Sequence, residues 1–247
     1  MNKAKPTYQL GAAQFLLTHA DPEFSQVLDR LLPRSHAPNS VQTTVCDIQM
    51  GLSFDIAEVL RQIIAQHVGC LLIQSASMVS PQGRRVLISG APGSGKTTLS
   101  IALALRHGWK VIADDMTIIN TRDNKIIGFA APFNLFPGTR KLLSEIGIAL
   151  PGFILREWYP LSTFTAEPSY EARFETWLHL DQSPDMGEFS CTQISKSDQT
   201  RKILSTSNLL SVRGTDRFME CVPESHCFSF RGGSLSERLE KTLELAL

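Results

Sequence analysis

The sequence predicts an α/β protein in which helices flank a mixed β-sheet, and three observations lead to that prediction. A short apolar run, Val86–Ile88, is followed by a glycine-rich loop and then by strong helix formers in Thr97–His107. A second apolar run, Trp109–Ala113, follows directly after Gly108. Strand, helix and strand in this order are typical of a βαβ unit, whose strands run parallel with a right-handed crossover.

The first part of the chain predicts a small N-terminal region, residues 1–53. Asp21 and Pro22 form a favourable helix start, and apolar residues follow them at helical spacing. Residues 41–50 predict a strand.

The larger domain, residues 54–247, begins with an apolar stripe at helical spacing from Ile56 to Ile64. Residues 70–77 then predict one buried strand, which forms a hairpin with Val86–Ile88 through a turn at Pro81–Gly83. The hairpin leads directly into the glycine-rich loop.

The chain after the βαβ unit predicts several shorter elements. A strand at 116–120 pairs back with residues 125–129, and short helices are expected within 138–147 and 198–209. Cys227–Phe230 alternates like a strand, and a capping box at Ser234 predicts a last helix.

Composition excludes some classes of partner. The 247 residues carry 24 basic and 24 acidic side chains, so the formal net charge is zero. A neutral chain has no field that gathers nucleic acid or anionic lipid, and we expect neither partner. The apolar runs fall short of the ~20 residues that span a membrane, and the first ten residues lack the features of a secretory signal.

Five cysteines, an odd number in a chain too long to need disulfides, predict free thiols in a reducing cytoplasm. Cys221, His226 and Cys227 are close in sequence, but their spacing fits no common zinc pattern and no fourth ligand is evident. We therefore expect no zinc site there.

The glycine-rich loop matches the phosphate-loop pattern G-x-x-x-x-G-K-[ST]. Its residues are Gly90, Ala91, Pro92, Gly93, Ser94, Gly95, Lys96, Thr97 and Thr98. Glycines let the backbone approach phosphate oxygens, exposed amides surround the anion, and the following helix adds its positive end. Lys96 is expected to reach the outer phosphates and Thr97 to ligate Mg²⁺, so the motif predicts ATP bound with magnesium.

Two adjacent carboxylates, Asp114 and Asp115, end the strand after the helix. Because parallel strands end at the same edge of a sheet, we expect both to lie beside the phosphate loop. One carboxylate can hold magnesium and the other can accept a proton from an attacking hydroxyl. The alternative is an ordinary acidic turn. His67, before the hairpin, is by position alone more often a packed or surface histidine than a catalytic one.

These residues together resemble the HPr kinase/phosphorylase family, a relative of the nucleotide site of phosphoenolpyruvate carboxykinase. The resemblance rests on His67 before a hairpin, the phosphate loop, one helix ending in Gly108, and Asp114-Asp115 directly afterwards. It covers residues 54–133. It implies an HPr-kinase/phosphoenolpyruvate-carboxykinase-like mixed sheet with a short N-terminal region, and it implies a homo-oligomer.

The resemblance also implies roles for the residues. Asp115 would be the general base, His67 would lie beside it, and Lys96 would stabilise the transferring phosphoryl group. Thr97 and Asp114 would hold magnesium.

The sequence departs from the family's pattern at two points. The family has a metal-binding glutamate in a glycine-containing motif, for which Glu145 is the nearest candidate. Its later arginine, which serves a reverse phosphorylase reaction, has only Arg201 and Arg213 as candidates, and neither has a motif.

Shorter relatives include stand-alone kinases found with peptide-modification genes, among them kinases of lasso peptide precursors. The resemblance therefore implies transfer of the γ-phosphoryl group to a serine of a peptide or protein. A kinase of small alcohols and a nucleotide-dependent ATPase or switch remain alternatives. Aromatic residues in the second half could line a peptide groove, but core packing is the preferred interpretation. They are Trp158, Tyr159, Phe164, Tyr170, Phe174 and Trp177.

Overall fold

The computed structural model describes twelve stretches of the chain. They are residues 7–10, 13–16, 22–32, 56–65, 67–123, 125–129, 131–150, 158–159, 169–171, 174–181, 187–208 and 226–246. The strand predicted within 41–50 lies outside them, as do Phe164, Arg213 and Cys221. The predicted boundary between residues 53 and 54 also falls outside the described residues.

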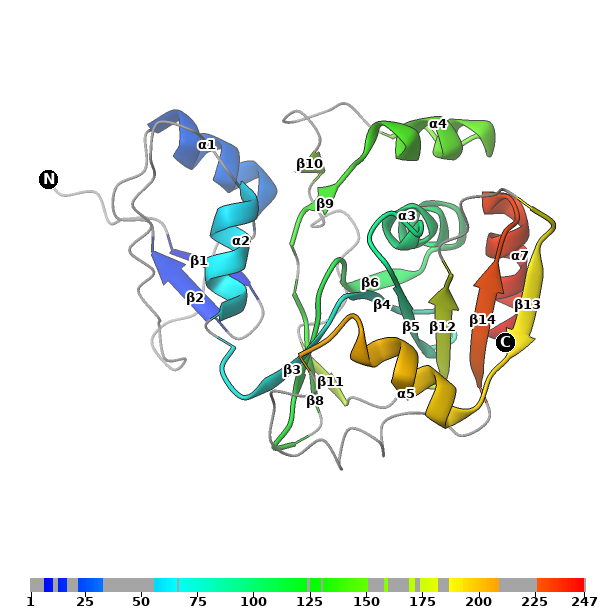
Figure 1. Ribbon diagram of the computed structural model, residues 1–247. Helices are drawn as coiled ribbons and strands as arrows, with labels where there is room; N and C mark the ends of the chain where they lie inside the picture. Colours follow the sequence, from blue (N-terminus) through cyan, green and yellow to red (C-terminus); the bar gives the residue numbers. More distant parts are fainter. Residues whose placement is uncertain are drawn as a thin grey trace, which may run out of the picture.

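A six-stranded mixed sheet forms the centre of the molecule, with the order β13-β14-β12-β5-β4-β6 (Figure 1). In that order the strands are Ser190–Gln193, Cys227–Arg231, Thr176–Leu180, Arg85–Gly90, Ser75–Val79 and Lys110–Ala113. β12 pairs parallel with both β5 and β14, whereas β4 and β13 pair antiparallel with their neighbours. This sheet and its flanking helices confirm the predicted fold class.

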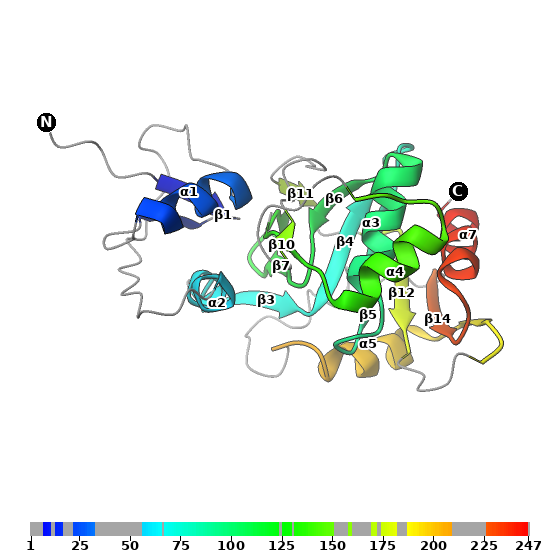
Figure 2. The same ribbon diagram turned by 90° about the horizontal axis from the view of Figure 1, so that it is seen from above.

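Helices cover both faces of this sheet. α3 (Lys96–His107) and α7 (Leu235–Leu245) pack on one face, and α4 (Pro137–Glu145) packs against α3. α5 (Lys196–Leu204) packs on the opposite face, as the two views in Figures 1 and 2 show.

The alternation of side chains along β5 explains why both of its faces are covered. Val86 and Ile88 belong to the core beneath α3, whereas Leu87 belongs to the core beneath α5. Ser89, the next residue on the α5 side, is fully buried and receives a hydrogen bond from Gln199 of that helix. Successive strand residues point to opposite faces, so a strand buried on both sides carries apolar side chains, or hydrogen-bonded ones such as Ser89, on both faces.

A smaller antiparallel sheet has the order β11-β8-β7-β3. Its strands are Ser169–Glu171, Lys125–Ile127, Thr117–Asn120 and Cys70–Ile73. The single strand predicted for residues 70–77 is therefore wrong, because β3 belongs to this sheet and β4 to the six-stranded sheet. The break lies at Gln74, whose amide donates to the Thr206 carbonyl at 2.8 Å instead of joining either ladder.

The N-terminal elements pack at one end of the molecule (Figure 1). They are β1 (Thr7–Leu10), β2 (Ala13–Leu16), α1 (Pro22–Leu31) and α2 (Ile56–Ala65). Tyr8, Leu28 and Val59 share one apolar cluster with Phe129. Through this cluster the N-terminal elements pack against Phe129, which lies just after β8.

The element ends match the predicted signals. Gly108 caps α3 in the left-handed region at φ 68°, and its amide donates to carbonyls of the last turn. Ser234 and Glu237 form both hydrogen bonds of the capping box at α7. Pro22 is the first residue of α1, as predicted, and Pro137, for which no start was predicted, begins α4.

The predicted parallel direction of the two strands of the βαβ unit is confirmed, and a third strand lies between them. β5 and β6 each pair antiparallel with β4, so they run parallel to each other with β4 between them. Both strands therefore end at the same edge of the sheet. The phosphate loop follows β5 there, and Asp114-Asp115 follows β6.

Candidate functional site

The phosphate loop begins at a glycine that no other residue can replace. Gly90 has φ 151°, and a Cβ built there would lie 2.5 Å from the Leu180 carbonyl oxygen and 2.6 Å from Ser94 Oγ. The loop therefore follows β5 in close contact with the end of β12.

The start of α3 has no side chain that caps it. Gly95 is the N-cap residue in the left-handed region, at φ 97°, and it makes no side-chain capping bond. The first amides of an α-helix have no partners within the helix, and together with the helix dipole they favour an anion. This end of α3 has the features of a phosphate site.

Lys96 is buried, and its ammonium lies against the loop. Its Nζ donates to the carbonyl oxygens of Gly90 at 2.8 Å and Ala91 at 3.0 Å. Burial lowers the pKa of Lys96, while the nearby Asp115 and Asp114 carboxylates oppose that shift. An ammonium has three donors, so one remains for a phosphate oxygen.

Thr97 and Asp114 are brought together from α3 and the end of β6. Thr97 Oγ1 donates to Asp114 Oδ2 at 2.8 Å. The other carboxylate oxygen, Oδ1, is buried and has no hydrogen-bond partner within the described part of the chain. Burial raises the pKa of Asp114 to about 7, and the Thr97 hydrogen bond only partly offsets that effect.

Asp115 is exposed and has an unusual backbone. It is the only non-glycine residue with positive φ in the described stretches, at 66°. Its carbonyl accepts from the Ser75 amide at 3.1 Å, which fixes the turn to the start of β4. Aspartate tolerates the left-handed region better than most residues, and such conformations are concentrated at functional sites.

A cavity of about 530 Å³ joins these groups. Lys96, Thr97, Asp114 and Asp115 line it together with residues of α2, Gln74 and the segment 129–142. The structure thus brings the predicted loop and both aspartates into one cavity, where a cation, a hydroxyl and two carboxylates face the same space.

His67 lies near this cavity but does not line it. Its ring packs edge-on against Phe129, a lining residue, with ring centroids 6.2 Å apart. Nδ1 lies 3.0 Å from the Ile63 carbonyl, so it carries the proton, and burial lowers the pKa of the ring. The buried Nε2 has no partner among the described residues. His67 is therefore a neutral base beside one wall, and its predicted role next to Asp115 stays a prediction.

Arg238 is a residue that the sequence interpretation missed. Its Nη1 donates to the Ser94 carbonyl at 3.0 Å and its Nε to the Gly232 carbonyl at 2.9 Å. The guanidinium thus fixes the back of the phosphate loop from α7. The capping box located this helix in the sequence, but no local signal placed Arg238 against Ser94, which lies 144 positions earlier.

Other candidates lie away from the cavity. Glu145 is exposed at the end of α4, and Arg201 is exposed on α5 and paired with Asp198 at 2.9 Å. Phe174 and Trp177 are buried against each other, which supports core packing for these two aromatic residues.

The residues present fit a magnesium ion that is held mainly by a bound triphosphate. Among the described residues, no group of three or more histidine, cysteine or acidic side chains could hold a metal by itself. Asp114 Oδ1 is a buried, unpartnered oxygen beside the Thr97 hydroxyl. Mg²⁺ in phosphate-transfer sites takes one or two protein oxygens and fills its remaining positions with phosphate and water.

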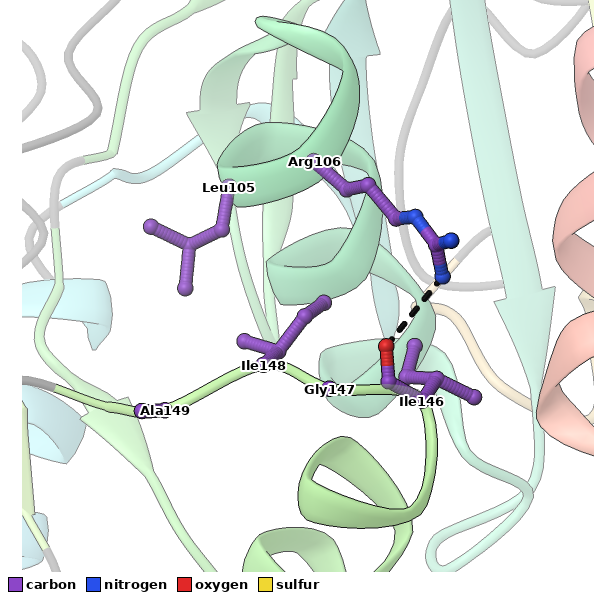
Figure 3. A pocket seen from close by; sticks show the side chains of 6 residues that line it. All are labelled: Leu105, Arg106, Ile146, Gly147, Ile148 and Ala149. Atoms are coloured by element: carbon purple, nitrogen blue, oxygen red, sulfur yellow. Dashed lines mark hydrogen bonds between the residues drawn. The ribbon is translucent and has the colours of Figure 1, made fainter.

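A second hollow, of about 490 Å³, lies at the opposite end of α3 (Figure 3). Leu105 and Arg106 border it from α3, and residues 146–149 border it from the segment after α4. Arg106 Nη1 donates to the Ile146 carbonyl at 3.2 Å, so this arginine holds the segment to the helix. The hollow is separate from the phosphate loop.

Comparisons with known proteins add a distant likeness of fold. No protein-family model matches the sequence, and no curated protein matches it. Among solved structures, it is similar to the Hpr(Ser) kinase/phosphatase from Coxiella burnetii, with 14% identity and a TM-score of 0.32. The match covers 70% of this chain and 96% of that chain. So low a TM-score carries no functional argument.

None of the described helices is both long and apolar enough to cross a membrane.

Proposed function

We propose that this protein is an ATP-dependent kinase that transfers the γ-phosphoryl group to a hydroxyl, on a serine of a peptide or protein. One observation carries the proposal: the 2.8 Å contact between Thr97 Oγ1 and Asp114 Oδ2 joins the phosphate loop to the paired aspartates. Asp115 lines the same cavity as Lys96. A site for phosphate alone has no need of the second carboxylate.

The loop and Lys96 bind the phosphates in this proposal. The uncapped start of α3 supplies amides, and Lys96 places its charge at the outer phosphates. Phosphoryl transfer needs little covalent chemistry from a protein, so positioning and charge neutralisation account for most of the acceleration. Hydrogen bonds from Lys96 to the loop carbonyls and from Thr97 to Asp114 hold these groups in place before ATP arrives.

Thr97 and Asp114 would hold Mg²⁺, which when bound neutralises charge on the phosphates. Burial holds the pKa of Asp114 near 7, so its carboxylate is at the border of ionisation before binding. Coordination favours the charged form.

Asp115 is the proposed general base. It is exposed at the cavity, where an incoming hydroxyl can reach it, and the positive-φ turn fixes its position. Accepting the hydroxyl proton contributes about 10²- to 10⁴-fold to such reactions.

The proposal is tested by incubating the protein with γ-labelled ATP and Mg²⁺ together with a panel of acceptors. The panel contains serine peptides with internal and terminal serines, free serine and small sugars. We expect label on peptide serine. Lys96→Ala should remove more than ~95% of the transfer, because a charged hydrogen bond to the transferring group is lost. Lys110→Ala, which removes an exposed lysine of β6, is the matched control and should retain full activity.

Three results would contradict the proposal. Label on free serine or sugar alone would identify a small-molecule kinase. Release of labelled phosphate with no labelled acceptor would identify an ATPase or switch. Equal transfer by the Lys96→Ala variant and the wild type would show that the phosphate loop takes no part in the reaction.

A further inference from the structure

The phosphate loop determines the direction in which a bound nucleoside extends along the cavity. Asp115 and Lys96 mark the end at which the γ-phosphoryl group must lie if the proposed function is correct. The nucleoside must then extend the other way, past Thr98. The Thr98 hydroxyl donates to Thr139 Oγ1 at 3.2 Å, so that direction leads to the first turn of α4.

The segment 129–142 forms one wall of the cavity along this whole path. Phe129 forms an isolated β-bridge with Ala113, the residue before the two aspartates. At the other end, the Thr139 hydroxyl accepts the hydrogen bond from Thr98. Between them lies β9 (Phe133–Asn134), whose backbone is fixed by antiparallel pairing with β10 (Trp158–Tyr159). The wall is therefore anchored at three points.

Phe136 is an exposed aromatic residue at the nucleoside end. Its side chain lines the cavity at the N-cap of α4 and is 61% exposed. The other large apolar side chains exposed in the described stretches, Val68 and Leu105, do not line this cavity. Stacking of a base on an aromatic ring stabilises a bound nucleotide, which explains an exposed aromatic residue here better than core packing does.

Asn134 supplies an unpaired acceptor in the same wall. It lines the cavity, and its Oδ1 is buried without a hydrogen-bond partner in the described residues. A buried polar atom without a partner destabilises the protein, so a ligand that donates to it is favoured. Adenine presents an amino group at its six position, whereas guanine presents a carbonyl oxygen there.

We propose that Asn134 and Phe136 form an adenine subsite. Phe136 stacks on the base, and Asn134 Oδ1 accepts a hydrogen bond from the six-amino group. This inference rests on the proposed function and deepens it, since it assigns the base preference of the same site. A guanine at this position would bring its carbonyl oxygen against Asn134 Oδ1, and its binding would require the amide to turn so that Nδ2 donates instead.

The test compares three ligands by titration calorimetry: ATP, GTP and inorganic tripolyphosphate, each with Mg²⁺. The wild type should bind ATP at least about tenfold more tightly than GTP. Phe136→Ala should weaken ATP about 10- to 100-fold and leave tripolyphosphate within about twofold, because only the base loses a contact. Asn134→Leu should bring ATP and GTP within about threefold of each other. Leu105→Ala, an exposed apolar side chain of the second hollow, is the control and should change none of these affinities.

The outcomes separate this inference from the proposed function. Unchanged ATP affinity in Phe136→Ala, or equal binding of ATP and GTP by the wild type, overturns the adenine subsite and leaves the phosphate site intact. Failure of the wild type to bind both ATP and tripolyphosphate overturns the two proposals together. Equal unfolding temperatures for wild type and variants ensure that folding does not cause the difference.

Discussion

Two clusters of polar side chains lie side by side at the same edge of the sheet, and they differ in how their polar atoms are paired. The phosphate-loop cluster consists of Lys96, Thr97, Asp114 and Asp115. The buried network consists of Ser89, His179, Asp181, Gln199, Lys202 and Ser229. Ser89 is followed directly by Gly90, the first glycine of the loop, so a single peptide bond joins the buried network to the phosphate loop.

The buried network is almost fully paired. Asp181 accepts from Lys202 Nζ and Ser229 Oγ, each at 2.6 Å, and His179 Nε2 lies 3.4 Å from the same carboxylate. His179 Nδ1 lies 3.0 Å from Ser89 Oγ. Of its buried atoms, Gln199 Oε1 has no partner among the described residues.

Ser89, His179 and Asp181 have the residue types of a hydrolytic triad, but the pairing indicates a structural role. Ser89 is fully buried, so no substrate can reach its hydroxyl. A catalytic serine must be accessible to the group that it attacks. In contrast, the phosphate-loop cluster leaves Asp114 Oδ1 unpaired and Asp115 exposed. Unpaired polar atoms beside a cavity thus indicate a ligand site, whereas the same residue types in mutual pairs stabilise the fold.

The largest effect is expected from Gly90→Ala, because Gly90 joins the two clusters. The new Cβ would overlap the Leu180 carbonyl at 2.5 Å, so stability should fall by about 2–4 kcal/mol and ATP binding should be lost. Gly83→Ala is the control, because Gly83 also has positive φ, at 83°, but no neighbour within 4 Å. Chemical denaturation should show a loss of only about 1–2 kcal/mol for the control. Equal losses in both variants would show that the close approach of the loop to β12 does not matter.

Asp181→Ala should break the buried network alone. It removes the partner of Lys202 and Ser229, and we expect a loss of about 1–2 kcal/mol, reduced because the carboxylate is one-third exposed. The Kd for Mg²⁺-ATP should stay within about threefold. Asp198→Ala, which removes an exposed pair with Arg201 and a hydrogen bond from the N-cap residue Ser195, should cost about 1 kcal/mol or less. A large loss of ATP affinity in Asp181→Ala, without unfolding, would show that the two clusters act as one binding site.

Asp114→Asn should change stability and binding in opposite directions. A carboxyl whose folded pKa is raised to about 7 adds stability below its unfolded pKa and loses it as the pH rises through 7. At pH 8 the folded wild type therefore holds a buried charge, and the amide should raise stability by about 1–2 kcal/mol. Magnesium-dependent ATP binding should weaken at least about tenfold. Thermal unfolding and calorimetry at pH 8 measure the two effects. A lower Tm for the variant would show that the carboxylate is not the destabilising member of the cluster.

The smallest effect is a pH dependence that belongs to the buried network. Burial, helped by Lys202, lowers the pKa of His179 to about 4 against the opposing effect of Asp181. The unfolded chain takes up a proton near pH 6.5 and the folded chain does not, so stability should fall between pH 6.5 and 4. His179→Gln should reduce this fall by about 1–2 kcal/mol at pH 5. Denaturant titrations of both proteins between pH 5 and 7.5 measure the difference. Parallel curves would show that His179 takes up its proton at the same pH in the folded and the unfolded chain, and so is not held neutral by the fold.

Much of the phosphate-loop cluster could be predicted because its signals are local. The loop, α3 and the paired aspartates occupy one short stretch, so strand direction alone placed Asp114 near Thr97. The break at Gln74 could not be predicted, because residues 70–79 contain no glycine, proline or charged residue that would mark a break. The change of sheet depends instead on partners at Asn120 and Thr206.

The sequence also did not predict the buried network, the contact of Arg238 with the phosphate loop, or the position of Asn134 and Phe136 in the cavity wall. His179 reaches Ser89 only because β12 inserts beside β5, and 90 positions separate the two residues. Such contacts depend on strand order, which no local pattern encodes. Phe136 gave no signal, because one aromatic residue before a helix is common.

The central claim is that the cavity beside the phosphate loop transfers phosphate with Asp115 as base. The most direct test measures transfer and ATP affinity in parallel for the wild type and Asp115→Asn, with Asp123→Asn as a control for an exposed carboxylate. We expect Asp115→Asn to lose at least about 100-fold in turnover while its Kd for Mg²⁺-ATP stays within about threefold. The control should match the wild type in both. Normal turnover in Asp115→Asn would contradict the claim.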